Sequence, residues 1–346
     1  MIRKIRVFSF LTFVGLLISW GLRDVAASEE KQQTYISSLA WSPDGSKVAI
    51  GYATPYCDSD PQFYIIHILD PVTRNVIQNL TGSTCSITSL DWSPDGTKVA
   101  ASSLDDWGLR VWDAQTGQLV STIQVGGQGV CSVKWKPDGF QLAAAGCSNG
   151  TALIDPNTGK GIGSPPIGGT SLAWSPDGSK LVSGSGYEGA VRVADMNADQ
   201  QIMYLEGHTA GISNVSWSPD GTLLVSAGGI DDPTIRIWDA ESGENTLILE
   251  EHTGAIRGVA WSPDSTRLVS ASSDGTVRIW DLTIGQLLET FSNTYPIYAV
   301  DWSPDGTQLA YGGSSPHGQE AQVKFVDVSD DFLTLTPNDA EATPES

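Results

Sequence analysis

His252, Ser272 and Asp274 are the residue types of a hydrolase triad, and His208 and Asp232 repeat its histidine–aspartate part earlier in the chain. In such a triad the histidine removes a proton from the serine while the aspartate orients the imidazole ring. The three groups act only if they converge on one pocket. Because the histidine–aspartate pair recurs along the chain, the sequence does not indicate that these residues converge on one catalytic pocket. We predict that the protein is not an enzyme.

Aspartates form a second set of residues with chemical potential. Carboxylate oxygens bind Ca²⁺, and a group of them attracts a basic segment of another protein. Aspartate is also a preferred turn residue that stays solvated. Asp58-Ser59-Asp60 is too short for a calcium loop, and no ligand set with a known spacing is present. We therefore predict no metal and no cofactor. The aspartates retained as candidate partner-binding residues are Asp58, Asp60, Asp105, Asp106 and Asp231.

Trp107 completes the candidate partner-binding set. It is the one tryptophan outside both the repeated motifs described below and the N-terminal apolar segment. If it is exposed, its large side chain would anchor a partner. If it packs into its own loop, it only fills space. The sequence leaves both interpretations open.

The elements that must position these residues follow from a repeat. Trp-Ser-Pro-Asp-Gly begins at residues 41, 92, 174, 217 and 302, and one-residue variants begin at 135 and 261. The first and last copies start 261 residues apart, so the six steps average 43.5 residues. A period of about 40–45 residues indicates one supersecondary unit copied around an array.

The repeated unit is predicted to contain four strands. Residues 256–261 alternate between apolar and polar, which is typical of a strand with one buried face. Pro, Asp and Gly after the tryptophan favour a tight turn. Further strands are expected at 267–271, 276–281 and 287–291, separated by turns that contain glycine. No helical pattern is present, so we predict an all-β fold.

These units resemble the repeats of the WD-repeat β-propeller family. Three of them end in the family's Trp-Asp pair, at Trp112-Asp113, Trp238-Asp239 and Trp280-Asp281, and one opens with Gly207-His208. The resemblance covers about residues 35–337. It implies a seven-bladed β-propeller of four-stranded antiparallel blades around a central channel.

The resemblance also implies a structural hydrogen-bond set of His, Ser or Thr, Asp and Trp in each blade. In the sixth unit the matching residues are His252, Ser272, Asp274 and Trp280. The fifth unit keeps His208, Asp232 and Trp238, with Gly228 in the place of the serine. In the second unit Ser103, Asp106 and Trp112 match, and Ser83 stands where the histidine would be.

Ring closure is the least regular part of the pattern. Members of the family often complete the last blade with an N-terminal strand, but residues 28–35 form a short polar lead that is poorly suited to this task. Phe332 to Thr336 have the spacing of a last fourth strand, so we predict that the C-terminal part completes its own blade. The propeller domain is then 36–337. Residues 338–346 are acidic and without aromatics, and they are predicted to be disordered.

The four cysteines suggest two disulfides. Cys131 and Cys147 are centred on residue 139, in a Pro-Asp-Gly turn, so they face each other across a hairpin. Cys57 and Cys85 fall in loops that share one face of a propeller. We predict the pairs Cys131–Cys147 and Cys57–Cys85. A metal site is the weaker alternative because the close-spaced cysteine pairs of such sites are absent.

The N-terminus has the order of a secretory signal peptide. Arg3, Lys4 and Arg6 precede an apolar run over residues 7–22, and Val25-Ala26-Ala27 offers small residues for cleavage. The run is short for a membrane span of about 20 residues. We predict a signal at 1–27 and export, either by secretion or to a periplasm. An uncleaved membrane anchor at residues 7–22 is the alternative.

Composition limits the partners. The chain has 40 acidic and 19 basic side chains, a formal net charge of −21, and the acidic excess argues against nucleic acid. We predict a monomeric, non-catalytic scaffold that binds protein partners, including ones with a basic surface, through the loops of one face. The alternative is a periplasmic or extracellular propeller that binds a ligand or glycan, or one of the Tol-associated type, with its site at the channel mouth.

Overall fold

The computed structural model describes residues 34–54, 64–104, 108–125, 129–148, 150–316, 319 and 321–328. Contacts divide the chain into Met1–Lys31 and Gln32–Ser346, and every described residue belongs to the second unit. The predicted signal segment 1–27, most of the polar lead 28–35 and the tail 338–346 therefore lie outside the described residues.

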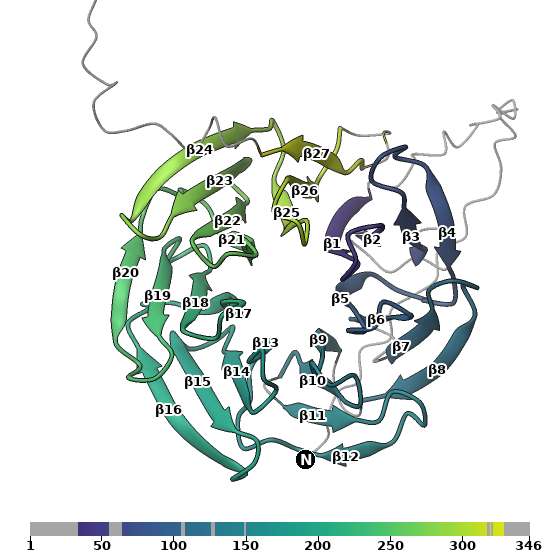
Figure 1. Cartoon of the computed structure of the whole chain (residues 1–346), viewed down its shortest axis with the longest axis horizontal. Helices are drawn as coiled ribbons and strands as arrows, with labels where there is room; N and C mark the ends of the chain where they lie inside the picture. The colour runs from purple at the N-terminus through teal and green to yellow at the C-terminus, as the bar shows by residue number, and fades with distance from the viewer. Residues whose placement is uncertain are drawn as a thin grey trace, which may run out of the picture. The chain divides into compact units, whose positions relative to one another are not determined.

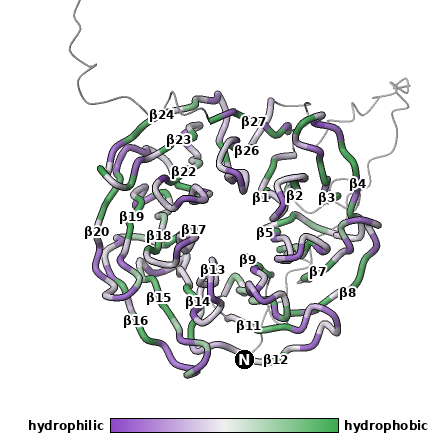
Figure 2. The backbone as a smooth tube through the Cα atoms, in the orientation of Figure 1, coloured by the Kyte–Doolittle hydropathy of each residue, from purple (hydrophilic) through white to green (hydrophobic). Residues whose placement is uncertain are grey.

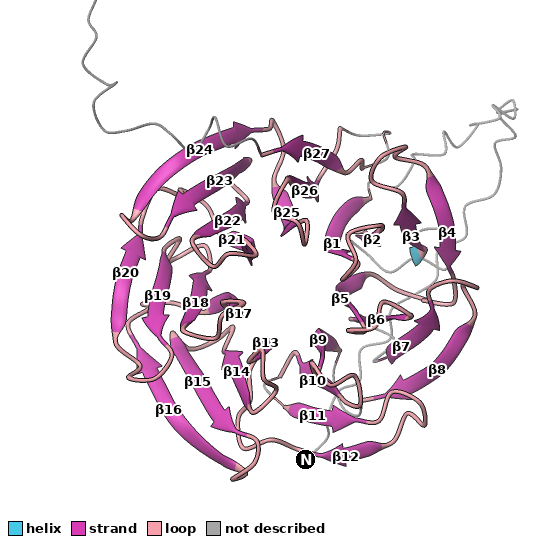
Figure 3. Cartoon of the chain, in the orientation of Figure 1, coloured by secondary structure: helices cyan, strands magenta, loops and turns pink. Residues whose placement is uncertain are grey.

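The described part of the second unit is a β-propeller, with antiparallel sheets arranged as blades around a central channel (Figure 1). Strands and turns make up nearly all of it (Figure 3). Along each blade, apolar and polar segments alternate (Figure 2). The predicted all-β, seven-bladed fold is confirmed.

The first three blades each contain four strands, ordered along the chain from the innermost to the outermost. Blade 1 comprises β1 (Tyr35–Trp41), β2 (Val48–Ala53), β3 (Ile66–Leu69) and β4 (Val76–Leu80). Blade 2 comprises β5 (Ile87–Trp92), β6 (Lys98–Ser103), β7 (Gly108–Asp113) and β8 (Leu119–Gln124). Blade 3 comprises β9 (Val130–Trp135), β10 (Leu142–Gly146), β11 (Thr151–Ile154) and β12 (Gly161–Gly163).

Blades 4 to 6 follow the same order. Blade 4 comprises β13 (Ser171–Trp174), β14 (Lys180–Gly184), β15 (Ala190–Asp195) and β16 (Gln200–Glu206). Blade 5 comprises β17 (Ile212–Trp217), β18 (Leu223–Gly228), β19 (Ile235–Asp239) and β20 (Asn245–Leu249). Blade 6 comprises β21 (Ile256–Trp261), β22 (Arg267–Ser272), β23 (Thr276–Asp281) and β24 (Gln286–Ser292).

Blade 7 has three strands among the described residues: β25 (Ile297–Trp302), β26 (Gln308–Gly313) and β27 (Lys324–Asp327). The predicted fourth strand, Phe332 to Thr336, lies outside them and stays a prediction. The predicted propeller start at residue 36 is close to the observed one, because β1 begins at Tyr35.

The antiparallel order gives the ring two distinct faces. On one, which we call the connection face, the outermost strand of each blade leads to the next blade, and the second strand turns into the third. On the other, the turn face, the first strand turns into the second through the Trp-Ser-Pro-Asp-Gly motif. Loops from different blades therefore meet at the connection face.

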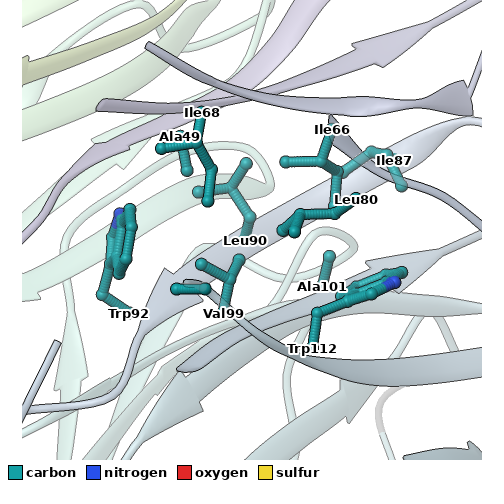
Figure 4. Packing of buried hydrophobic residues seen from close by; sticks show 11 residues of the cluster. Ala49, Ile66, Ile68, Leu80, Ile87, Leu90, Trp92, Val99, Ala101 and Trp112 are labelled. Carbon is teal, nitrogen blue, oxygen red and sulfur yellow. The ribbon is translucent and has the colours of Figure 1, made fainter. Parts of the chain in front are cut away.

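The core lies between neighbouring blades. Ile66, Ile68 and Leu80 of blade 1 pack against residues of blade 2 that include Leu90 and Trp112 (Figure 4). The second strand of a blade is buried on both faces, as in β6 and β22, whereas the outermost strand β8 is mostly exposed. Each blade thus buries apolar surface only when it has a neighbour on both sides.

The repeated turn is held by its own side chains. In blade 2, Ser93 donates a hydrogen bond from Oγ to Asp95 Oδ1 at 2.6 Å, and the backbone N–H groups of Thr97 and Lys98 donate to Asp95 and Ser93. Gly96 adopts a φ of 68°, which favours glycine. These bonds hold the pKa of Asp95 down at about 2, with the hydrogen bond from Ser93 as the largest cause.

The turns also contact one another around the ring. A Cβ atom placed on Gly96 would lie 3.8 Å from Pro43 of the preceding turn, and one on Gly45 would lie 3.5 Å from Pro304. The second contact joins the first blade to the last. The motif therefore fixes each turn locally and sets its distance to its neighbour.

Blades 1 and 7 close the ring by packing side chains, since β1 is the innermost strand of its own blade. Ile36 is fully buried, and a Cβ on Gly312 of β26 would lie 2.6 Å from its Cδ1 atom. The backbone N–H of Trp41 donates to Asp301 Oδ2 at 2.9 Å, and Tyr35 forms a bridge with Ser314. No strand exchange between these blades occurs within residues 34–328 as far as they are described.

We predict that Gly312→Ala weakens this closure. The added methyl group overlaps Ile36, and overpacking of a well-packed core costs about 1–3 kcal/mol of unfolding free energy. Gly150→Ala is the matched control, because a Cβ atom there meets nothing within 4 Å. Chemical denaturation of both variants measures the difference. Equal stability of the two would show that close packing at Gly312 is unimportant.

Candidate functional site

The histidine sets are complete in two adjacent blades. In blade 5, His208 Nδ1 lies 2.9 Å from Asp232 Oδ2, and its Nε2 lies 2.8 Å from Ser226 Oγ, which also accepts a hydrogen bond from Trp238 Nε1 at 2.8 Å. Burial lowers the pKa of His208, so its imidazole is neutral at pH 7. We assign Nδ1–H as the donor to Asp232 and Nε2 as the acceptor from Ser226.

Blade 6 has the same arrangement. His252 Nδ1 lies 2.9 Å from Asp274 Oδ2, and its Nε2 lies 2.7 Å from Ser270 Oγ, to which Trp280 Nε1 donates at 2.8 Å. Burial lowers the pKa of His252 as well. Asp274 has its pKa held at about 2, although burial opposes this, because Thr276, His252 and Thr253 all donate hydrogen bonds to it.

The predicted serine was wrong by two positions. Ser270 bonds to His252, whereas Ser272 donates to Gly254 O and accepts from the N–H of Asp274. Both serines lie on the same face of β22, but the pairing of Leu268 with Trp280 places Ser270 beside the indole.

The same register corrects two further assignments. In blade 5 Ser226 occupies the serine position of the set, so the prediction that Gly228 replaces this serine was wrong. In blade 2 the pairing of Val99 with Trp112 puts Ala101 there instead of Ser103. Trp112 Nε1 donates to Thr81 O instead. Asp106 lies outside the described residues.

These sets do not form a reactive site. His208 is 8% exposed and His252 is 4% exposed, and every polar side-chain atom of each imidazole has a partner within its own blade. The arrangement fixes the connection between blades to the turn that follows the second strand. It does not present a serine nucleophile to a pocket.

The blades surround a central channel. It encloses about 340 Å³ and is lined by the first strands of all seven blades. Many of its hydroxyl groups join neighbouring strands. Ser38 Oγ accepts from Leu90 N at 3.0 Å, and Ser171 Oγ accepts from Val215 N at 3.1 Å. These serines have a structural role.

Two carboxylates lie in the channel close to the turn face. Asp91 Oδ2 accepts a hydrogen bond from the N–H of Trp135 at 2.7 Å, and Asp301 Oδ2 accepts from that of Trp41 at 2.9 Å. Lys134 Nζ lies 3.7 Å from Asp91. Burial raises the pKa of both carboxyls, that of Asp301 to about 6, and repulsion by Asp91 adds to the shift at Asp301.

On the connection face, hydrogen bonds link the loops of blades 3, 4 and 5. The hydroxyl of Tyr187 donates to Cys147 O at 3.1 Å, and Cys147 is disulfide-bonded to Cys131 across their hairpin, with Cα atoms 5.0 Å apart. Ile212 N donates to Ser185 O at 2.8 Å, and Gly229 N donates to Gly211 O at 2.9 Å. We call this the rim of blades 3 to 5. Its residues are Cys147, Ser185–Tyr187, Gly211–Ile212 and Gly229–Asp231.

Two large apolar side chains project from this rim. Tyr187 is 72% exposed and Ile230 is 64% exposed. Asp231, a predicted partner-binding residue, is exposed beside Ile230. A hydrogen-bonded backbone thus presents an aromatic, an aliphatic and an acidic side chain to solvent.

The other predicted residues of this face are not placed. Asp58, Asp60, Asp105, Asp106 and Trp107 lie outside the described residues. Cys85 is disulfide-bonded, and its predicted partner Cys57 also lies outside them. Where the chain is described, no three or more His, Cys, Asp or Glu side chains form a group that suits a metal ion. No helix in that part has the length and apolar character needed to cross a membrane.

Sequence reasoning missed Ile230 and the channel carboxylates. Ile230 is a lone apolar residue in a loop, which carries no periodic signal. Asp91 and Asp301 each precede the repeated tryptophan, so alignment of the seven units would have shown that they replace alanine, serine or lysine at one position.

Comparison with known proteins identifies the repeat. A family model described as "WD domain, G-beta repeat" matches residues 74–113, 164–195, 199–239, 243–281 and 285–327, more than half of the chain. Four of these segments begin in or just before the outermost strand of one blade and end at or near the third strand of the next.

Three curated proteins are similar over shorter stretches. U3 small nucleolar RNA-associated protein 21 of Saccharomyces cerevisiae is 38% identical over 17% of this chain and 6% of its own length. THO complex subunit 3 of Arabidopsis thaliana is 27% identical over 28% of this chain and 29% of its own length. Echinoderm microtubule-associated protein-like 2 of Rattus norvegicus is 30% identical over 29% of this chain and 15% of its own length. The matched segments thus span less than a third of each relative.

We predict that Asp301→Asn changes the pH dependence of stability. A carboxyl whose pKa is raised from 3.8 to about 6 costs stability as pH rises between these values, because the unfolded chain ionises first. Asparagine does not ionise and still offers Trp41 an acceptor. The unfolding free energy of Asp301→Asn relative to the wild type should rise between pH 4 and pH 7 by at most about 3 kcal/mol, the free-energy equivalent of a pKa shift from 3.8 to about 6.

Asp305→Asn is the control with the opposite sign. Hydrogen bonds from Ser303 and Thr307 lower the pKa of Asp305, so its stabilising effect is present at neutral pH and is lost as pH falls through the lowered pKa. Denaturation curves that extend from pH 7 to below pH 4 separate the two, because the Asp301 effect changes above pH 4 and the Asp305 effect changes below it. A pH profile of Asp301→Asn that parallels the wild type would contradict a raised pKa at Asp301.

Proposed function

Since the chain belongs to the WD-repeat family, we propose that it is a non-catalytic scaffold that binds a protein partner through its connection face. The observation that carries the proposal is the rim of blades 3 to 5, where Tyr187 and Ile230 are exposed on a hydrogen-bonded backbone. Rigid loops that present aromatic and apolar side chains lose little conformational entropy when they bind.

The buried histidine sets support a non-catalytic role. Their serine, histidine and aspartate atoms are bonded within single blades, so the residue types that resemble a triad already serve the fold. Two of the similar proteins have names that place them in assemblies, as a THO complex subunit and as a microtubule-associated protein. Those names support binding of proteins as the general role and do not identify a partner here.

The proposal includes the sign of the charge on the partner's contact surface. The chain carries a formal net charge of −21, and Asp231 is exposed on the rim. A partner with basic residues around its contact surface would associate faster with such a protein, and salt would weaken that effect. We expect the apolar contacts of Tyr187 and Ile230 to supply most of the affinity.

We predict that Tyr187→Ala and Ile230→Ala each weaken partner binding by about tenfold or more, as the loss of a central contact residue does. Capture with residues 28–346 from the matching extracellular or periplasmic fraction, with quantification of bound proteins, measures this. Phe140→Thr is the matched control, because Phe140 is 76% exposed but lies in a turn-face motif. Equal loss in all three variants, or none in any, would count against the rim.

Export is the second element of the proposal. It is supported by the signal-like order of residues 1–27 and by the Cys131–Cys147 disulfide, a bond that persists in oxidising compartments. The alternative, a membrane anchor, uses the same apolar segment but requires that the chain is not cleaved after it.

We predict that the protein made from Met1 in a secreting host starts at Ser28 and has cysteines that alkylate only after reduction. Intact-mass measurement of each cell fraction tests both points. Ala27→Lys should block cleavage, because the site requires small residues, and it serves as the size standard for the uncleaved chain. An intact N-terminus in the membrane fraction would support the anchor instead, and free thiols in the cytosol would refute export.

A further inference from the structure

The channel mouth on the connection face is asymmetric. At the position four residues before each repeated tryptophan, the first strands of blades 1 to 5 carry small side chains, which are Ser37, Thr88, Cys131, Thr170 and Ser213. Blades 6 and 7 carry Arg257 and Tyr298 there, and both line the channel. The fold accepts a small residue at this position in five blades, so packing of the ring does not require the two long ones.

Arg257 has unused hydrogen-bonding capacity. Its Nε donates to Ser273 Oγ at 3.0 Å, which leaves the four terminal N–H groups of the guanidinium. The other basic residue of the channel, Lys134, lies 3.7 Å from Asp91, whereas no carboxylate within the described ranges lies within 4.0 Å of Arg257. The chain has 40 acidic side chains, yet none of the described ones pairs with this arginine at the mouth.

Tyr298, at the corresponding position of the next blade, lines the channel together with Arg257, and Tyr35 contacts Tyr298. The ring of Tyr298 lies 5.0 Å from that of Tyr35, centre to centre, and Ser314 donates to the Tyr298 hydroxyl at 3.4 Å. The Tyr35 hydroxyl makes no hydrogen bond in the part of the chain that the structure describes. Burial raises the pKa of Tyr35, the neighbouring Tyr298 adds to this shift, and the charge of Arg257 opposes it in part. At neutral pH the phenol is therefore a proton donor.

We propose that Arg257, Tyr298 and Tyr35 form a carboxylate-binding site at the channel mouth, which takes an Asp, Glu or C-terminal carboxylate of the protein partner. A guanidinium presents paired N–H groups that match the two oxygens of a carboxylate. The phenol hydroxyls add neutral donors, and their rings exclude water on one side. The inference rests on the proposed scaffold function and makes it specific: the partner inserts an acidic group at the mouth.

Phage-displayed random twelve-residue peptides, selected on residues 28–346, test the site without a known partner. Two selected peptides and their Glu→Gln or Asp→Asn counterparts are then titrated by fluorescence anisotropy. We expect acidic residues to be enriched, and neutralising the peptide's acid to weaken binding by about tenfold or more, the size of a hydrogen bond to a charged group. Arg257→Gln should cause the same loss.

The controls separate charge, geometry and folding. Lys160→Gln removes one positive charge from an exposed turn-face position and should leave binding unchanged. Arg257→Lys keeps the charge without the planar fork and should bind with intermediate affinity. Arg257→Gln should also make the acidic peptide and its neutral counterpart bind equally, a result that a merely destabilised variant would not give.

The outcomes distinguish this inference from the scaffold function. Peptides that bind without acidic enrichment and are insensitive to Arg257→Gln would overturn the carboxylate site while leaving protein binding intact, and sensitivity to Tyr187→Ala would then place them on the rim. Equal losses in Lys160→Gln and Arg257→Gln would reduce the effect to net charge and also overturn the site. Absence of any binding peptide would count against both proposals.

Discussion

Every blade of this propeller depends on its two neighbours, because the second strand of a blade has no face turned to solvent. β6 and β22 are buried almost from end to end. The strands of their own sheet flank their edges, so neighbouring blades must cover their faces. The apolar side chains of one blade therefore find their partners on the next, as Leu80 and Ile66 do beside blade 2. A ring built in this way is stable only when it closes, so the contact of Ile36 with Gly312 matters as much as any other interface.

Closure of the ring also determines the chemistry of the channel. Seven first strands surround the channel, and some of their N–H groups donate to side chains of a neighbouring blade. Serine hydroxyls and the carboxylates of Asp91 and Asp301 accept hydrogen bonds from these groups. These hydrogen bonds give the serines concerned and the two carboxylates of the lining a structural explanation. Arg257 lies outside that explanation, since among the described residues its side chain donates one hydrogen bond, to Ser273 Oγ, and its terminal N–H groups have no protein partner there.

Local patterns predicted the fold well, and inter-strand register limited the prediction of sites. The Trp-Ser-Pro-Asp-Gly motif encodes its turn within five residues, so the positions of its five copies and two variants could be read directly. The partner of His252 could not, because Ser270 and Ser272 share a strand face and differ only in which residue of β23 lies opposite. The sequence contains no marker for that register, which is set by the continuous pairing of β22 with β23.

The rim required information that no local pattern carries. Tyr187 could be noted as a loop aromatic, but its bond to Cys147 joins residues 40 positions apart in different blades. The exposure of Ile230 likewise depends on how blade 5 places its loop. Arg257 was accessible in principle, because alignment of the seven first strands shows a long cation where five units have small residues. The alternation of apolar and polar residues within one unit does not reveal Arg257, because only a comparison of equivalent positions in different blades does so.

Charge at long and short range acts differently on a partner of this protein. The formal charge of −21 attracts basic surfaces and repels acidic ones, but at physiological ionic strength such effects fade over about 8 Å. A carboxylate that reaches the mouth meets Arg257 directly, at a distance where hydrogen bonds and the local cation outweigh the screened field. An acidic group alone would approach slowly, whereas one carried on a basic surface would be attracted first and bound afterwards. The two charge preferences therefore belong to one partner surface, with basic residues facing the rim and an acidic group at its centre.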